Sequence, residues 1–101
     1  MSDDSNKLPP QNQEAEQSVL GAILIDPSSI SLITEDLKID HFYFKENAVI
    51  YDVMLKLYVE NRPIDILTLS HELKKESTYK DSGGKSYLSQ LLEIVPTSAN
   101  I

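Results

Sequence analysis

Apolar residues recur at helical spacing in five segments of this chain, and polar or proline-containing breaks separate the segments. The first predicted helix spans Glu14 to Ile25, with apolar positions 15, 19, 22 and 23 in register. Asp26 is expected to cap a second, short helix through its carboxylate. Pro27 suits the first position of that helix, where its missing N–H costs no hydrogen bond. The inner stripe predicted for the second helix is Ile30, Ile33 and Leu37.

The third predicted helix is the longest and runs from about Glu46 to Glu60, after an aromatic-rich turn at residues 40–44. Its apolar residues go nearly all the way round, which is typical of a helix buried on every side. The sequence Asn61-Arg62-Pro63 should end it. We therefore expect this helix to be the central element of the fold.

Two further helices complete the pattern. Asp65 can cap the fourth, for which we predict an inner face of Ile66, Leu69 and Leu73 and an outer face of His71, Glu72, Lys74, Lys75 and Glu76. A polar loop over residues 77–84 leads to the fifth. The apolar face of the fifth helix is predicted to be Tyr87, Leu88, Leu91, Leu92 and Val95.

These elements predict an all-α domain over residues 11–101, preceded by a flexible tail over residues 1–10. The core is expected to centre on six apolar side chains: Val53, Leu57, Leu69, Leu88, Leu91 and Leu92. Thr97 or Ser98 could cap a sixth helix, yet the sequence stops at Ile101. We therefore expect a fragment that ends at a domain boundary.

Charge and composition narrow the classes of function. The net charge is −7, and residues 1–50 carry nine acidic and three basic residues. An acidic surface repels phosphate, so weak or no direct binding of DNA is expected. There is no cysteine to form a disulfide or a thiolate metal site. The sequence has no apolar run long enough for a membrane span.

Two short motifs resemble known ligand-binding motifs, but each lacks a required residue. Gly84-Lys85-Ser86 resembles the end of a phosphate-binding loop, but the required earlier glycine is replaced by Tyr79. His71-Glu72 begins like a zinc-protease motif, but lysine stands where the second histidine is needed. His41, in the aromatic turn, is interpreted as a structural, hydrogen-bonding histidine. We predict no catalytic, cofactor-binding or metal-binding residue.

Four segments, in order, resemble the N-terminal domain of bacterial DnaB-type replicative DNA helicases. They are PPQNQEAEQSVLGAILIDP, the Phe42-Tyr43 turn with Ile50-Tyr51, PIDILTLSHEL, and GGKSYLSQLLEIVPTSANI. The resemblance implies a small orthogonal bundle of about five to six helices, a headpiece without catalytic activity of its own. In this family a helical hairpin and a RecA-like motor domain follow, and the motor uses ATP and Mg²⁺. Most of the hairpin is missing, so the headpiece should be monomeric or weakly associating.

The resemblance also implies partners. In the family the N-terminal domains form the collar of a hexameric ring in the bacterial cytoplasm, at the replisome. The collar receives the C-terminal domain of primase, and a helicase loader or an initiator is a further candidate partner. Primase docking is expected around Glu14, Gln17, Tyr87 and Asn100. The alternative for the three polar residues is helix-start polarity, and for Tyr87 it is core packing.

The sequence departs from the family at two places. Asn47 and Ala48 replace a histidine followed by arginine or glutamine, and Ser82 replaces an apolar residue before the two glycines. Two other interpretations stay open: the helicase-binding C-terminal domain of primase, and a free-standing adaptor or inhibitor that mimics the headpiece. A motor domain downstream in the same gene would decide against the second.

Overall fold

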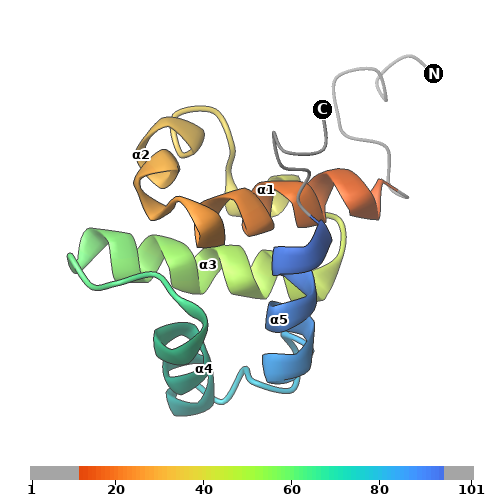
Figure 1. Cartoon of the computed structure of the whole chain (residues 1–101), viewed down its shortest axis with the longest axis vertical. Coiled ribbons are helices and arrows are strands. Elements are labelled where there is room, and N and C mark those ends of the chain that lie inside the picture. Colours follow the sequence, from red (N-terminus) through yellow and green to blue (C-terminus); the bar gives the residue numbers. More distant parts are fainter. Residues whose placement is uncertain (1–11, 95–101) are drawn as a thin grey trace.

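The computed structural model describes residues 12–94, and the elements in this part of the chain are all helical (Figure 1). They are α1 (Gln13–Ile25), the 3₁₀ helix η2 (Pro27–Ser29), α2 (Ile30–Ile33), the 3₁₀ helix η3 (Ile39–His41), α3 (Lys45–Val59), α4 (Ile66–Lys75) and α5 (Gly84–Ile94). The all-α prediction is confirmed. The sixth helix proposed at Thr97 or Ser98, and Val95 of the fifth, lie outside the described residues.

The helices cross in two directions. α1 and α3 run alongside each other, while α4 and α5 run across them, and α5 packs against α1 (Figure 1). This is the orthogonal arrangement expected of the headpiece. No helix within residues 12–94 is long and apolar enough to cross a membrane.

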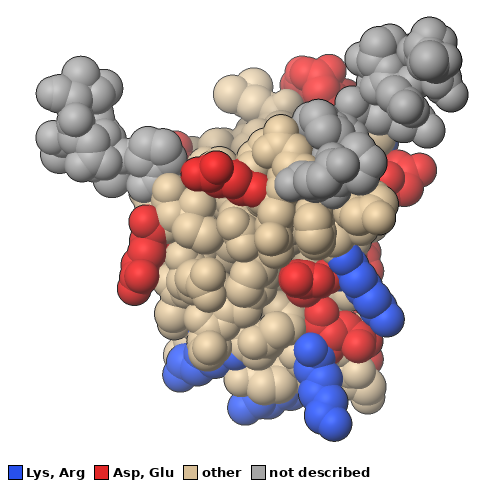
Figure 2. Space-filling view, turned by 90° about the vertical axis from the view of Figure 1, so that its right-hand side faces the viewer, with Lys and Arg blue, Asp and Glu red and all other residues tan. Residues whose placement is uncertain are grey.

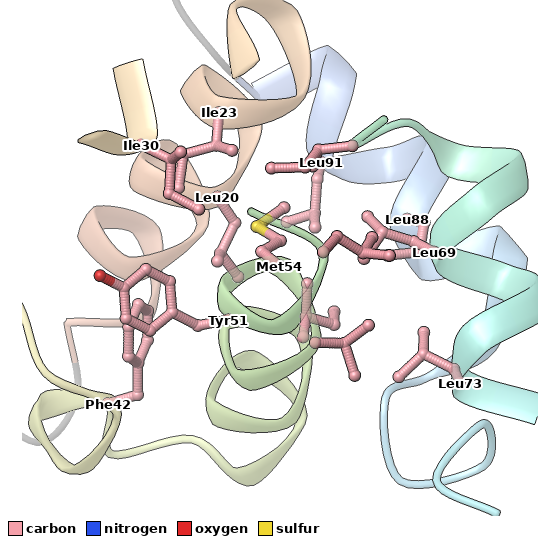
Figure 3. Packing of buried hydrophobic residues seen from close by; sticks show 14 residues of the cluster. Leu20, Ile23, Ile30, Phe42, Tyr51, Met54, Leu69, Leu73, Leu88 and Leu91 are labelled. Atoms are coloured by element: carbon pink, nitrogen blue, oxygen red, sulfur yellow. The ribbon is translucent and has the colours of Figure 1, made fainter. Parts of the chain in front are cut away.

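The core forms around α3, which lies between α1 on one side and α4 and α5 on the other (Figure 3). Five of the six predicted core residues are buried. Leu92 is the exception, with 38% of its surface exposed. Adjacent residues on a helix point about 100° apart, so α5 cannot bury both Leu91 and Leu92 in the same interface.

The prediction that α3 is buried on every side is wrong at its last turn. Its buried residues follow one helical face: Asn47, Ile50, Tyr51, Val53, Met54 and Leu57. Val59 lies two positions beyond Leu57, about 200° around the helix, and is 81% exposed. Tyr58 is 43% exposed. The pattern of apolar residues therefore overstated how much of α3 is covered.

The helix ends test the two predicted N-caps, Asp65 and Asp26. The Asp65 carboxylate accepts the Thr68 amide at 2.8 Å, so this predicted cap is confirmed. The predicted Asp26 cap is wrong, since its carboxylate accepts the Ser28 hydroxyl at 2.7 Å instead of a backbone amide. The segment opens with a 3₁₀ turn, in which the Asp26 backbone carbonyl accepts the Ser29 amide.

The turns on either side of α3 are also built from local hydrogen bonds. His41 Nδ1 accepts the Lys38 amide at 3.1 Å, the structural role expected of this histidine. After α3, Asn61 adopts a positive φ of 61°, and the Arg62 amide bonds back to the Leu57 carbonyl. This six-residue closure ends the helix where the sequence predicted.

Candidate protein interface

A buried carboxylate joins the start of α1 to the start of α3. Glu16 is 1% exposed, and its carboxylate accepts the Tyr43 amide at 2.7 Å, the Phe44 amide at 3.3 Å and the Asn47 side-chain amide at 2.9 Å. Phe44, the residue before α3, has no polar side-chain atom that could cap the helix. Glu16 therefore supplies from α1 the negative group that a helix N-terminus favours.

Asn47 links Glu16 to α5 through two hydrogen bonds. Its side-chain N–H donates to Glu16, and its carbonyl oxygen accepts the Tyr87 hydroxyl. The Tyr87 oxygen in turn accepts the Gln17 side-chain amide at 3.1 Å. Burial raises the pKa of the Tyr87 phenol, and the hydrogen bond from Gln17 opposes that rise. The phenol therefore keeps its proton at neutral pH and can donate it to Asn47.

The structure brings two of the four predicted interface residues together. Gln17 and Tyr87 are 70 positions apart in sequence and in hydrogen-bond contact, each partly exposed. Glu14 is exposed one turn before Gln17, on the same part of α1. Asn100 lies outside the described residues. Tyr43, held by Glu16 at its backbone, adds an aromatic side chain that is 66% exposed.

The start of α1 and α5 lie on the side of the molecule that Figure 2 displays. Much of this face is uncharged, with acidic side chains in its upper part, at its left edge and right of its centre, and the basic side chains in its lower half. A broad uncharged area with a charged border resembles the composition of a protein interface. The candidate interface is defined here as Glu14, Gln17, Tyr43 and Tyr87.

A second buried carboxylate overturns one sequence prediction. Glu72 was placed on the outer face of α4 but is only 2% exposed. It accepts the Arg62 guanidinium at 3.0 Å, and Lys56 lies 3.8 Å away. The hydrogen bond from Arg62 lowers the pKa of Glu72. This cluster joins the end of α3 to α4, so its role in the described structure is to hold two helices together.

The glycine loop before α5 uses its own backbone donors. The Gly83 amide bonds to the Lys80 carbonyl, the Gly84 amide to the Ser82 hydroxyl, and the Lys85 amide to the Tyr79 hydroxyl at 2.9 Å. A phosphate-binding loop needs such amides free to surround phosphate oxygens. Ser82, the departure from the family pattern, is buried and shapes this turn.

Replacing Gly83 with alanine should lower the free energy of unfolding by about 1–3 kcal/mol. Gly83 has a φ of +87°, and an added Cβ would lie 2.8 Å from the Tyr87 Cβ. Chemical denaturation followed by circular dichroism would measure the change. Gly84→Ala is the matched control, because Gly84 has a similar φ of +75° but its added Cβ would lie no closer than 3.4 Å to any atom. Equal losses from both changes would show that the contact with Tyr87 costs nothing.

Sequence reasoning missed Glu16 and Asn47, the two buried residues at the centre of this junction. One signal was available for Glu16, because it shares a helical face with Leu20 and Ile23 at spacings of four and seven. The predicted stripe ran through positions 15, 19, 22 and 23, of which Ile23 is buried and the other three are only half buried. Asn47 has the same kind of spacing to Ile50, Tyr51 and Met54, but its partners come from other helices and could not be read from the sequence. Among the described residues, no group of three His, Asp or Glu side chains could hold a metal ion.

Comparison with known proteins identifies what the chain is similar to. Residues 8–101 match the family model described as the DnaB-like helicase N terminal domain. The replicative DNA helicase DnaC of Bacillus subtilis (strain 168) is 44% identical over 97 residues, which are 96% of this chain and 21% of the relative. The replicative DNA helicase DnaB of Geobacillus stearothermophilus is 39% identical with the same coverage of both chains. The chain therefore spans about a fifth of the length of these relatives.

A solved structure shows the same fold. The crystal structure of the N-terminal domain of DnaB helicase from Mycobacterium tuberculosis superposes with a TM-score of 0.83 at 39% sequence identity. The match covers 92% of this chain and 65% of that one. The expected family and the expected fold are thus confirmed by sequence and by structure comparison.

Proposed function

Because the chain belongs to the DnaB-like helicase N-terminal domain family, we propose that it serves in the collar of a hexameric replicative DNA helicase and docks primase there. The role of the domain itself is to bind other proteins. The curated relatives carry the name of replicative DNA helicases, which favours the helicase over the primase C-terminal domain with a related fold. Unwinding is the task of the whole protein, in the bacterial cytoplasm at the replisome.

The motor chemistry is proposed for the parent protein alone. There, ATP and Mg²⁺ would drive unwinding in a domain to which this chain does not correspond. The 14 acidic residues among positions 12–94 outnumber the eight basic ones. The headpiece should therefore contact DNA weakly, and DNA binding by the ring would come from other parts of the protein. A helicase loader or an initiator is a further candidate partner.

The Gln17–Tyr87 contact is the observation that carries the docking proposal. It presents one amide and one phenol, from the first and last described helices, at a single partly exposed position. The phenol donates a hydrogen bond to buried Asn47, which is itself held by buried Glu16, so the orientation of the phenol is fixed before a partner binds. Tyrosine is enriched among the residues that dominate binding energy, and a fixed side chain loses little entropy on binding.

We expect Glu14→Lys and Tyr87→Ala each to weaken binding of the primase C-terminal domain about tenfold or more. The first change reverses a charge at the edge of the interface, and the second removes its fixed aromatic ring. Isothermal titration calorimetry with the primase of the same genome would give the dissociation constants. Circular dichroism would verify that each variant is folded.

Glu35→Lys is the matched control for charge, because Glu35 is exposed in the turn after α2, outside the candidate interface. It should bind primase as the unchanged domain does. If both test variants are folded and keep full affinity, the interface lies elsewhere. If the unchanged domain does not bind primase at all, the docking function itself is refuted.

A further inference from the structure

A second surface lies at the opposite end of α1 from the candidate interface. There the ends of α1 and α3 and the segment before α4 surround an open hollow of about 570 Å³. Glu14 and Leu24 are ten positions apart on α1, a separation of about 15 Å along the helix. The hollow can therefore be tested independently of the candidate interface.

The floor of the hollow is largely apolar. Its apolar lining comes from five residues: Leu24, Pro27, Tyr58, Pro63 and Ile64. Ile25 and Val59 each follow a lining residue in sequence and are exposed at 53% and 81%, and Leu67, two positions beyond Asp65, is exposed at 73%. With half-exposed Tyr58, these are four of the eight large exposed apolar residues among positions 12–94. An exposed, largely apolar lining with polar residues among it is typical of a binding site for another molecule.

The charges around the hollow are mainly negative. Asp26, Glu60 and Asp65 lie on or next to the segments that line it. Its basic lining residue is Arg62, whose guanidinium contacts both Glu60 and Glu72 at 3.0 Å. That positive charge is already balanced by carboxylates. A partner that covers the hollow would therefore gain from basic side chains placed around an apolar anchor.

We propose that the hollow binds an amphipathic helix of a partner protein, one whose apolar stripe is bordered by lysine or arginine. An apolar helix face laid into an apolar groove is a recurring mode of peptide recognition. A small molecule is less suited, because the hollow is open and ligand sites bury most of the ligand surface.

A second copy of this chain is the alternative occupant of the hollow. Its lysines gather at the α4–α5 end, with Lys74, Lys75, Lys80 and Lys85 exposed. The strongly exposed apolar residues elsewhere among positions 12–94, Leu32 and Tyr43, lie in other segments, near Glu35, Asp36 and Asp40. Lys45, however, is exposed two positions after Tyr43, so the sedimentation test below decides between a second copy and a different partner.

The test uses two synthetic helical peptides of 14 residues, one of leucine and lysine and one of leucine and glutamate in the same pattern. Nuclear magnetic resonance would follow the backbone amides of the ¹⁵N-labelled domain during titration. The leucine–lysine peptide should shift the amides of Leu24, Tyr58 and Ile64. The leucine–glutamate peptide should bind at least about tenfold more weakly. Equal binding of the two peptides, or shifts confined to α5, would overturn the proposal.

Two variants with matched controls locate the binding. Tyr58→Ser removes an apolar lining side chain and should weaken binding of the leucine–lysine peptide about tenfold, whereas Leu92→Ser on α5 should not. Asp65→Asn removes a charge but keeps a side-chain oxygen that can cap α4, and it should also weaken binding. Its control is Asp52→Asn, at an exposed position of α3 outside the lining.

Sedimentation of the domain alone tests whether a second copy of the chain, and not a partner helix, fills the hollow. If the unchanged domain forms dimers that Tyr58→Ser dissociates, a second copy fills the hollow and the proposal is wrong. If all four variants bind the leucine–lysine peptide as the unchanged domain does, the hollow is not its site.

Discussion

Replacing Leu91 with alanine is expected to lower the free energy of unfolding by about 2–5 kcal/mol. Leu91 is fully buried, and in Figure 3 its side chain lies in the core near Ile23 and Met54. Truncation removes buried apolar surface and leaves a cavity that neighbouring helices cannot fully close. A domain of this size has about 5–15 kcal/mol of stability in total, so the loss should be visible as a much lower urea midpoint.

Leu92→Ala is the matched control for that experiment. The same side chain is shortened one position further along α5, where 38% of its surface is already exposed. We expect a loss of about 1 kcal/mol or less, since little cavity forms at a partly exposed position. Equal losses from the two variants would mean that the orientation of α5 is wrong.

Glu16→Ala is expected to cost about 3–5 kcal/mol, because it removes the acceptor that several buried N–H donors share. Its carboxylate accepts three N–H groups, at Tyr43, Phe44 and Asn47. Each donor that is left buried without a partner costs about 1–3 kcal/mol, and the start of α3 also loses its negative group. Urea denaturation would measure the loss.

The control for Glu16 lies two positions away on the same helix. Glu14 is exposed, so Glu14→Ala should change the stability by about 0.5 kcal/mol or less. Glu16→Gln should fall between the two, because it keeps an acceptor oxygen but places an N–H₂ group among other donors. If Glu16→Ala were as stable as Glu14→Ala, the network would not contribute to the fold.

The sequence predicted the helices well because local signals specify them. The Asp65 cap, the break at Asn61 and the two glycines before α5 are short-range features, and each lies where it was expected. Most of the core followed from helical spacing alone. The predictions failed where a side chain has two possible environments, as Leu92 and Val59 do at the edges of otherwise apolar faces.

Polar character alone assigned the buried polar residues to the wrong environment. Glu16, Asn47 and Glu72 are polar, and a polar residue is ordinarily assigned to solvent. Their burial is tolerated because partners from other segments satisfy them, and those partners are known only once the helices are placed. For the same reason the contact between Gln17 and Tyr87 emerged only from the fold, although both residues were already candidates.

The pairing of α1 with α5 has a consequence for how the domain is made on the ribosome. Gln17 is synthesised 70 residues before its partner Tyr87. At bacterial and eukaryotic translation rates of about 5–20 residues per second, that interval lasts roughly 4–14 s. During it, α1 can pack against α3 but not yet against α5. The part of α1 that α5 covers therefore stays exposed for seconds, a period in which a ribosome-associated chaperone could bind the nascent chain.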